Sequence, residues 1–190
     1  AHGYDNQANQ LTLSPLLLDS FLRLSLSIVG SPDFNENTVG IWNDFFRDPG
    51  GSDQRAEIRK RLEPFLLLAF RSTVDEETVD RYTDYALGKV QEGLSFPDAM
   101  KRVASAVLSS PRFLFRYGST AKGQDLFVVA SNLSYFLWNS SPDLALLRLA
   151  ESGELATLGT FRETIDRMLA DSRIERFLDS FPSQWMQLEN

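Results

Sequence analysis

Apolar residues recur along this chain at spacings of three and four, which predicts amphipathic α-helices. The clearest example lies within residues 95–117, where one apolar stripe is made by Phe96, Met100, Val103, Val107 and Leu108. Ser95 and Asp98 form a capping-box pattern at its start, and Pro111 predicts that the helix ends just before it. The string Phe-Leu-Phe at 113–115 has the composition of an apolar strap wedged between helices.

The same pattern occurs on both sides of this stretch. Near the N-terminus, one apolar face has offsets of four, three and four residues and consists of Leu17, Phe21, Leu24 and Ile28. Further helix starts are predicted at capping residues, namely Asp53, Asp75, Asp125, Thr160 and Asp171. Pro64 should kink or restart its helix, and residues 33–51 fit either a short helix or a loop.

No stretch alternates between apolar and polar residues with a period of two. We therefore expect a mainly α protein, an irregular array of about eight amphipathic helices with short loops. The Gly-containing segment 118–124 divides it into two helical regions, 1–117 and 118–190, which we expect to pack as one unit. The chain starts at Ala1 rather than Met and stops after a helical pattern, so we expect a piece of a longer protein.

The net charge of −7 argues against two classes of partner. A nucleic-acid-binding surface needs clustered Lys and Arg to displace counterions, and anionic membranes repel an acidic protein. The longest apolar run, residues 65–70, is too short to cross a bilayer. We therefore predict no nucleic-acid partner and no membrane span.

The residue types needed for common catalytic and cofactor sites are scarce. The chain has no Cys, which excludes thiolate metal sites, covalent c-type haem attachment and Cys nucleophiles within it. His2 is the single histidine, with only Asp5 as a nearby carboxylate, so a catalytic triad is not expected. Most acidic residues fall in first helical turns or on polar faces. We predict no catalytic, cofactor-binding or metal-binding residue in this chain.

Four residues are candidates for a ligand or domain-contact surface: Arg112, Arg116, Trp138 and Trp185. The two arginines flank the apolar strap, where they would grip an anionic ligand or pair with acidic helix ends. The two tryptophans close apolar helices, where they would form an aromatic platform for a sugar or haem, or pack in the core.

Three blocks of sequence resemble known families. GYDN followed by LTLSPLLL (3–18) resembles the end of the domain of unknown function 1587. FRSTVDEETVDRY (70–82) and SFPDAMKRVASAVLSSPRFLFR (95–116) resemble the domain of unknown function 1595. ASNLSYFLWNSSPD (130–143), RMLADSR (167–173) and SQWMQL (183–188) resemble the start of the domain of unknown function 1592.

The resemblance implies a context rather than a chemistry. Domains in this order occur in large exported proteins of the planctomycete type, often with a c-type haem carried elsewhere in the parent chain. It implies a periplasmic or otherwise exported location, with other domains of the same parent chain as partners. It supplies no catalytic residue.

Three functions are consistent with these observations. The leading hypothesis is a non-catalytic helical scaffold or interaction module, in which the strings SPRFLFR and SYFLW join neighbouring helices. The alternatives are a part of a c-type-haem oxidoreductase acting on polysaccharide-derived material, and a carbohydrate-binding module using Trp42, Trp138 or Trp185. Self-association is expected if the apolar face of residues 174–188 is uncovered.

Overall fold

The regular structure of this protein is helical. The computed structural model describes residues 15–51, 53–115 and 125–179, and within these ranges it contains no strand, which confirms the predicted mainly α fold. The first part of the chain contains α1 (Pro15–Val29), the π-helical turn η2 (Trp42–Phe46), α2 (Gln54–Phe70), α3 (Glu76–Gln91), α4 (Phe96–Leu108) and α5 (Pro111–Leu114). The second contains α6 (Leu126–Trp138), α7 (Leu144–Ser152), η3 (Glu154–Ala156), α8 (Leu158–Ala170) and η4 (Ser172–Ile174).

Capping side chains set where most helices begin. The predicted caps Asp53, Asp75, Ser95 and Asp125 each accept a hydrogen bond from a backbone amide of the first turn. The start predicted at Thr160 is wrong. Thr157 has the extended backbone of a cap and accepts from the Thr160 amide, so residue 160 already lies in the first turn of α8.

Pro64 does not restart its helix. The helix α2 continues through it, from Gln54 to Phe70. A proline deprives the carbonyl four residues earlier of its hydrogen bond. That carbonyl belongs to Lys60, which lies on the exposed side of α2, where water can satisfy it.

The first hydrophobic core lies between α2, α3, α4 and η2. Aromatic rings make up much of it: the Phe45 ring centroid lies 4.4 Å from that of Phe65 and 4.9 Å from that of Phe46. The apolar stripe predicted on α4 is buried here, with Met100, Val103 and Val107 fully covered.

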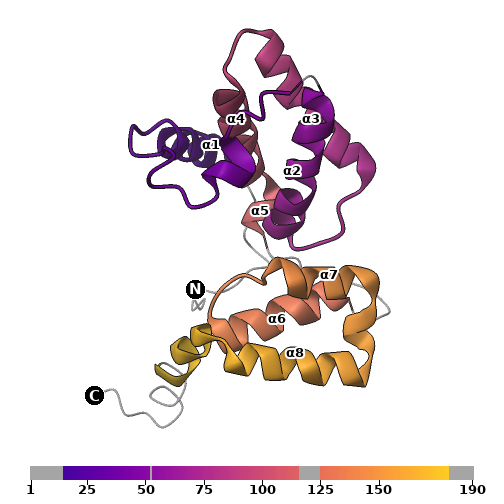
Figure 1. Cartoon of the computed structure of the whole chain (residues 1–190). Helices are drawn as coiled ribbons and strands as arrows, with labels where there is room; N and C mark the ends of the chain where they lie inside the picture. Colours follow the sequence, from indigo (N-terminus) through magenta and orange to yellow (C-terminus); the bar gives the residue numbers. More distant parts are fainter. Residues whose placement is uncertain (1–14, 52, 116–124, 180–190) are drawn as a thin grey trace, which may run out of the picture.

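The second hydrophobic core lies between α6, α7, η3 and α8. Its largest fully buried side chain is Trp138, which packs with Leu146, Leu147 and Met168. Leu67 of α2 also belongs to this core, and α2 contacts α7. The helices α1 to α5 and α6 to α8 therefore meet along α2 (Figure 1).

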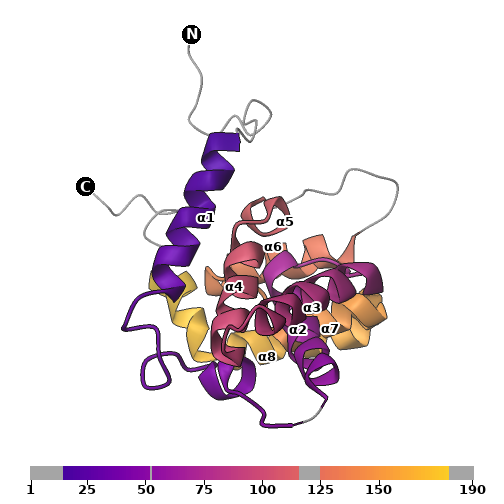
Figure 2. The ribbon, with the colours of Figure 1, turned by 90° about the horizontal axis from the view of Figure 1, so that it is seen from above.

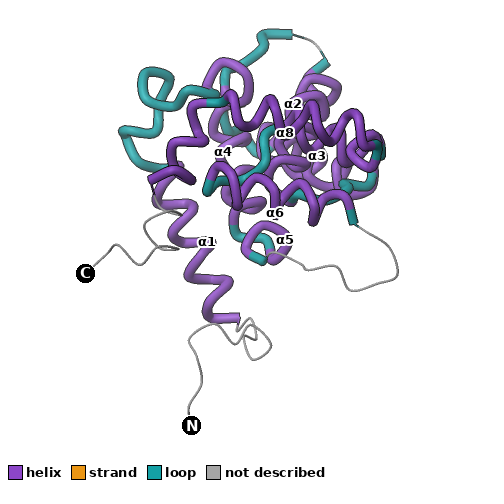
Figure 3. Tube along the Cα trace, turned by 90° about the horizontal axis from the view of Figure 1, so that it is seen from below, coloured by secondary structure: helices purple, strands orange, loops and turns teal. Residues whose placement is uncertain are grey.

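The helix α1 packs on α4 and projects from the other helices (Figures 2 and 3). Its buried residues are Ser25 and Val29, and the Ser25 hydroxyl donates to the Ser105 carbonyl at 3.2 Å. The apolar face predicted from the sequence lies beside this contact and remains on the surface, with Leu24 55% and Ile28 51% exposed.

Candidate functional site

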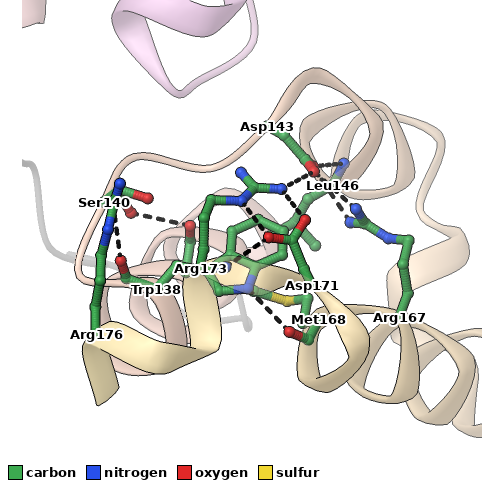
Figure 4. A network of polar contacts seen from close by, with 10 residues as sticks. Trp138, Ser140, Asp143, Leu146, Arg167, Met168, Asp171, Arg173 and Arg176 are labelled. Atoms are coloured by element: carbon green, nitrogen blue, oxygen red, sulfur yellow. Dashed lines mark hydrogen bonds and ion pairs between the residues drawn. The ribbon is translucent and has the colours of Figure 1, made fainter. Parts of the chain in front are cut away.

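Trp138 is the centre of a network of polar contacts at the end of α6 (Figure 4). The indole is completely buried, and its Nε1 donates to the Met168 carbonyl at 3.0 Å. The guanidinium of Arg173 lies over the ring, 3.4 Å from the centroid, and that of Arg167 lies 5.5 Å away. The network therefore joins the end of α6 to α8 and η4 by stacking as well as by hydrogen bonds.

Arg173 is held in place by Asp171. Its Nε and Nη2 donate to the two carboxylate oxygens at 2.8 and 2.7 Å, which is a bidentate pair. Asp171 also accepts from the backbone amide of Arg173 at 2.9 Å. The side-chain hydrogen bond from Arg173, followed by the amide, lowers the pKa of Asp171, and the same carboxylate raises the pKa of Arg173.

Asp143 connects this pair to α7. It is the N-cap of α7, accepting from the Leu146 amide at 2.9 Å, and it forms ion pairs with Arg167 at 2.7 Å and Arg173 at 3.3 Å. Burial acts to raise the pKa of Asp143, but the hydrogen bonds from Arg167 and the Leu146 amide, together with the nearby charges, outweigh it and lower the pKa. The carboxylate is therefore ionised at neutral pH.

Two further contacts attach the loop between α6 and α7. Arg176 donates to the Trp138 carbonyl at 3.3 Å, and the Ser134 hydroxyl donates to the Ser140 carbonyl at 2.9 Å. The charged groups facing Trp138 thus have partners of opposite charge or backbone carbonyls within the fold. An anionic ligand would have to displace Asp143 or Asp171, so the arrangement is suited to holding helices together.

The sequence analysis identified Trp138 but missed the arginines and the role of Asp143. Asp171 was predicted only as a helix cap, which it is. The sequence held one indication of this network. The two strings that carry the resemblance to the domain of unknown function 1592, residues 130–143 and 167–173, contain nearly all the residues of the network. These two strings, separated by more than twenty residues, meet around one indole.

Arg112 holds α5, which contains most of the predicted apolar strap, against the end of α2. Its Nη2 donates to the Thr73 carbonyl at 2.8 Å, and its guanidinium lies 4.5 Å from the centre of the Phe70 ring. In return, Arg71, which follows the end of α2, donates to the Phe113 carbonyl of α5 at 2.8 Å. Asp75, the cap of α3, has a pKa lowered mainly by the Thr78 amide and also by the charge of Arg112. Arg112 is thus engaged between helices of its own region.

The remaining candidates cannot be placed in this way. Arg116 and Trp185 lie outside the described residues, and so does His2. Arg112 and Trp138 belong to contacts around different cores. A ligand or domain-contact surface shared by all four candidates stays a prediction.

Two stretches of the chain match models of protein families. Residues 57–117 match the family described as PSD5, protein of unknown function (DUF1595). Residues 125–190 match the family described as PSD4, protein of unknown function (DUF1592). The chain thus contains regions similar to two families of unknown function. No curated protein and no solved structure matches it.

The two matched regions follow the division between the cores. The DUF1595 region begins within α2 and includes the strap, and the DUF1592 region begins at the cap of α6 and contains the whole Trp138 network. The resemblance of residues 3–18 to the domain of unknown function 1587 and a planctomycete-type origin stay predictions.

A broad hollow lies on the surface where α2 passes η2. It has a volume of about 430 Å³ and is lined by apolar, polar and charged residues: Ile41, Asn43, Asp44, Phe45, Glu57, Lys60, Arg61, Pro64, Phe65 and Leu68. Arg61 is already engaged there, because it pairs with Glu57 at 2.8 Å and donates to the Arg47 carbonyl at 2.6 Å.

A smaller hollow lies in the DUF1592 region between α6, η3 and α8. Its volume is about 230 Å³, and the described residues that line it are all apolar: Leu126, Val129, Leu155, Ala156, Leu158 and Phe161. None of these six side chains is polar, so none of them could orient a reacting group. In the ranges that the structure describes, no three His, Cys, Asp or Glu residues lie together in a way that could hold a metal ion.

The tryptophans bear on the carbohydrate alternative. Trp138 is buried and presents no face to a sugar. Trp42 is partly exposed, but it packs against Phe34 and Phe46, and the Lys101 ammonium lies 5.4 Å from its ring.

Among residues 15–51, 53–115 and 125–179, no helix is both long and apolar enough to span a bilayer.

Proposed function

We propose that this chain is a helical interaction module of a larger protein, without a catalytic role of its own. The observation that carries the proposal is the apolar face of α1, where Leu24 and Ile28 are about half exposed on a helix that projects from the fold. Exposed apolar surface of this kind usually marks a contact with another molecule or domain.

The use of the polar side chains supports the same proposal. The arginines around Trp138 and at the strap bind carboxylates and carbonyls of their own chain, which fixes helices relative to one another. Among the described residues, no fully buried side-chain nitrogen or oxygen lacks a hydrogen-bond partner. The polar groups thus serve the fold, while Leu24 and Ile28 of α1 lie on its surface.

The proposed setting is an exported parent chain that carries a c-type haem elsewhere. It rests on the resemblance described above. Because the present chain has no Cys, covalent attachment of such a haem would need residues outside it. An absorbance spectrum of the exported parent protein tests this setting separately from the interaction role.

The interaction role is tested with a dye that fluoresces on apolar surfaces, added to the 190-residue chain at about 1 µM, where weak self-association is negligible. We expect the dye to bind the folded chain and Leu24→Glu to reduce its fluorescence severalfold. Leu169→Glu, at an exposed leucine of α8 that lines neither of the hollows described above, is the matched control and should leave most of the signal. Near-ultraviolet circular dichroism and cooperative unfolding verify that each variant is folded.

A folded chain that does not bind the dye would refute the proposal, because the apolar face of α1 would then be covered. Equal loss of fluorescence in the Leu24→Glu variant and its control would assign the binding to general exposed surface instead.

A further inference from the structure

Another hollow lies between the end of α1 and the first half of α4. Its volume is about 300 Å³, and aliphatic side chains share its lining with charged ones: Leu26, Val29, Gly30, Leu94, Asp98, Lys101 and Arg102. Leu24 and Ile28, which carry the proposed interaction role, do not line it. An inference from this hollow therefore goes beyond that role.

The two adjacent cations of this hollow are not paired within the described part of the chain. No described carboxylate forms an ion pair with Lys101 or Arg102, and neither side chain donates a hydrogen bond to a described residue. The hollow beside η2 differs in this respect, because its Arg61 already pairs with Glu57 at 2.8 Å. The charges of Lys101 and Arg102 are thus available to a ligand.

Aromatic rings hold the Lys101 ammonium in place. Its Nζ lies 5.5 Å from the centroid of Phe34 and 5.4 Å from that of Trp42, and Lys101 is partly buried. The attraction of a cation to a ring fixes the position of the ammonium but leaves its N–H groups able to donate to an anion. Partial burial strengthens the attraction between such a charge and a bound anion.

Asp98 is the carboxylate among the residues that line the hollow. Its Oδ2 accepts from the Ser95 hydroxyl at 2.6 Å, as part of the cap of α4. Two cations and one carboxylate leave a local charge of +1 in a chain whose net charge is −7. An acidic chain repels anions in general, so an anion that binds here must be recognised by these local groups.

We propose that this hollow binds a small organic anion with an aliphatic chain. The anionic group binds Lys101 and Arg102, and the chain lies against Leu26, Val29 and Leu94. A neutral chain would leave the two cations without a partner, and a bare anion would leave the aliphatic side chains uncovered. The volume falls at the lower end of the range for small-molecule sites, about 300–1,000 Å³.

Titration of the 190-residue chain with hexanoate, followed by its amide signals in nitrogen-15 NMR spectra at neutral pH, tests the proposal. We expect saturable shifts mainly at residues 26–30 and 94–102, with a dissociation constant of roughly 1–10 mM for a ligand of this size. 1-Hexanol carries the chain without the charge, and acetate carries the charge without most of the chain. Each should bind at least about threefold more weakly than hexanoate.

Three variants locate the site. Arg102→Gln removes an exposed cation and should weaken hexanoate binding about threefold or more. Lys101→Met keeps an unbranched side chain beside Phe34 and Trp42 but removes the charge, and should weaken binding to a similar extent. Arg81→Gln, at an exposed arginine of α3 that also has no ion pair with a described residue, is the matched control. It makes the same change in net charge and should leave the dissociation constant unchanged.

A titration that does not saturate by about 50 mM hexanoate would overturn the proposal. Equal affinity for hexanoate and 1-hexanol would also overturn it, as would equal affinity for hexanoate and acetate, or an affinity that Arg102→Gln and Lys101→Met both leave unchanged. Cooperative unfolding verifies that each variant is folded. None of these measurements involves Leu24 or Ile28, so the proposed interaction role is judged separately.

Discussion

The two cores of this protein use charge in different ways. In the first, the ion pairs of Arg55 with Asp80 and Asp84 lie on the surface between α2 and α3, and the better-covered pair of Arg61 with Glu57 lies at the edge of the core, beside the Phe96 ring. In the second, Asp143 is mostly covered and its partners Arg167 and Arg173 lie against a buried indole. Exposed pairs contribute little because water and salt screen them. Removing one partner of a covered pair costs more, because the remaining charge is left partly buried without its partner.

The two regions therefore differ in what stabilises them. The first core is packed with rings, so we expect it to stay together if its surface ion pairs are lost. The second is smaller, and charged side chains cover its largest residue. Its stability should therefore depend on ionisation, and three predictions test this difference.

Trp138→Ala should have the largest effect. It leaves a cavity in the second core and removes the surface on which Arg173 stacks, so we expect a loss of about 3–5 kcal/mol in the free energy of unfolding. Urea denaturation followed by circular dichroism measures it. Phe46→Ala, at a buried ring of the first core, is the control. Hydrogen exchange should then increase mainly in α6 to α8 for Trp138→Ala and mainly in α2 to α4 for Phe46→Ala. The same exchange pattern in both variants would mean that the two cores unfold as one unit.

Leu67→Ala tests the contact between the regions. Leu66 and Leu67 are adjacent, equally buried and on one helix, but Leu66 belongs to the first core and Leu67 to the second. Each substitution should cost about 2–4 kcal/mol. We expect Leu67→Ala to increase hydrogen exchange in α7 and Leu66→Ala to increase it in α3. If Leu67→Ala left α7 unaffected, the contact of α2 with α7 would have no role in stability.

Asp143→Asn should have the smallest effect at neutral pH. It keeps the shape and the capping oxygen but removes the charge facing Arg167 and Arg173, for which we expect a loss of about 1–2 kcal/mol after screening by solvent. Asp80→Asn makes the same change at an exposed ion pair of the first region and should cost less than about 1 kcal/mol. Equal losses would remove the distinction between the two regions.

The pH dependence of the same variant sharpens this test. The folded state lowers the pKa of Asp143 and Asp171 below the ordinary value of 3.8, so the unfolded chain takes up protons first as the pH falls. Their contribution is present above about pH 4 and is lost as the pH falls below it. Urea midpoints between pH 7 and pH 3 should therefore fall less for Asp143→Asn than for the unmodified chain. Parallel curves would show that Asp143 does not contribute.

Local patterns in the sequence were sufficient to predict most helices. The caps at Asp53, Asp75 and Ser95 each act through the amide three residues away, and helical periodicity relates residues three or four apart. The error at Thr160 has the same origin, because Thr157 and Thr160 are both competent caps and only the backbone shows which one is used.

The Trp138 network and the exposure of α1 depended on tertiary structure. Asp143 meets Arg173 from thirty residues away, and no local pattern states which carboxylate will reach which arginine. The periodicity of α1 likewise predicted an apolar face but not whether another helix covers it. The sequence by itself determined a mainly α chain with well-capped helices and no cysteine chemistry, because these properties depend on composition and near neighbours. Only the tertiary structure decided which apolar face is buried and which charges are joined, because both depend on how distant segments pack.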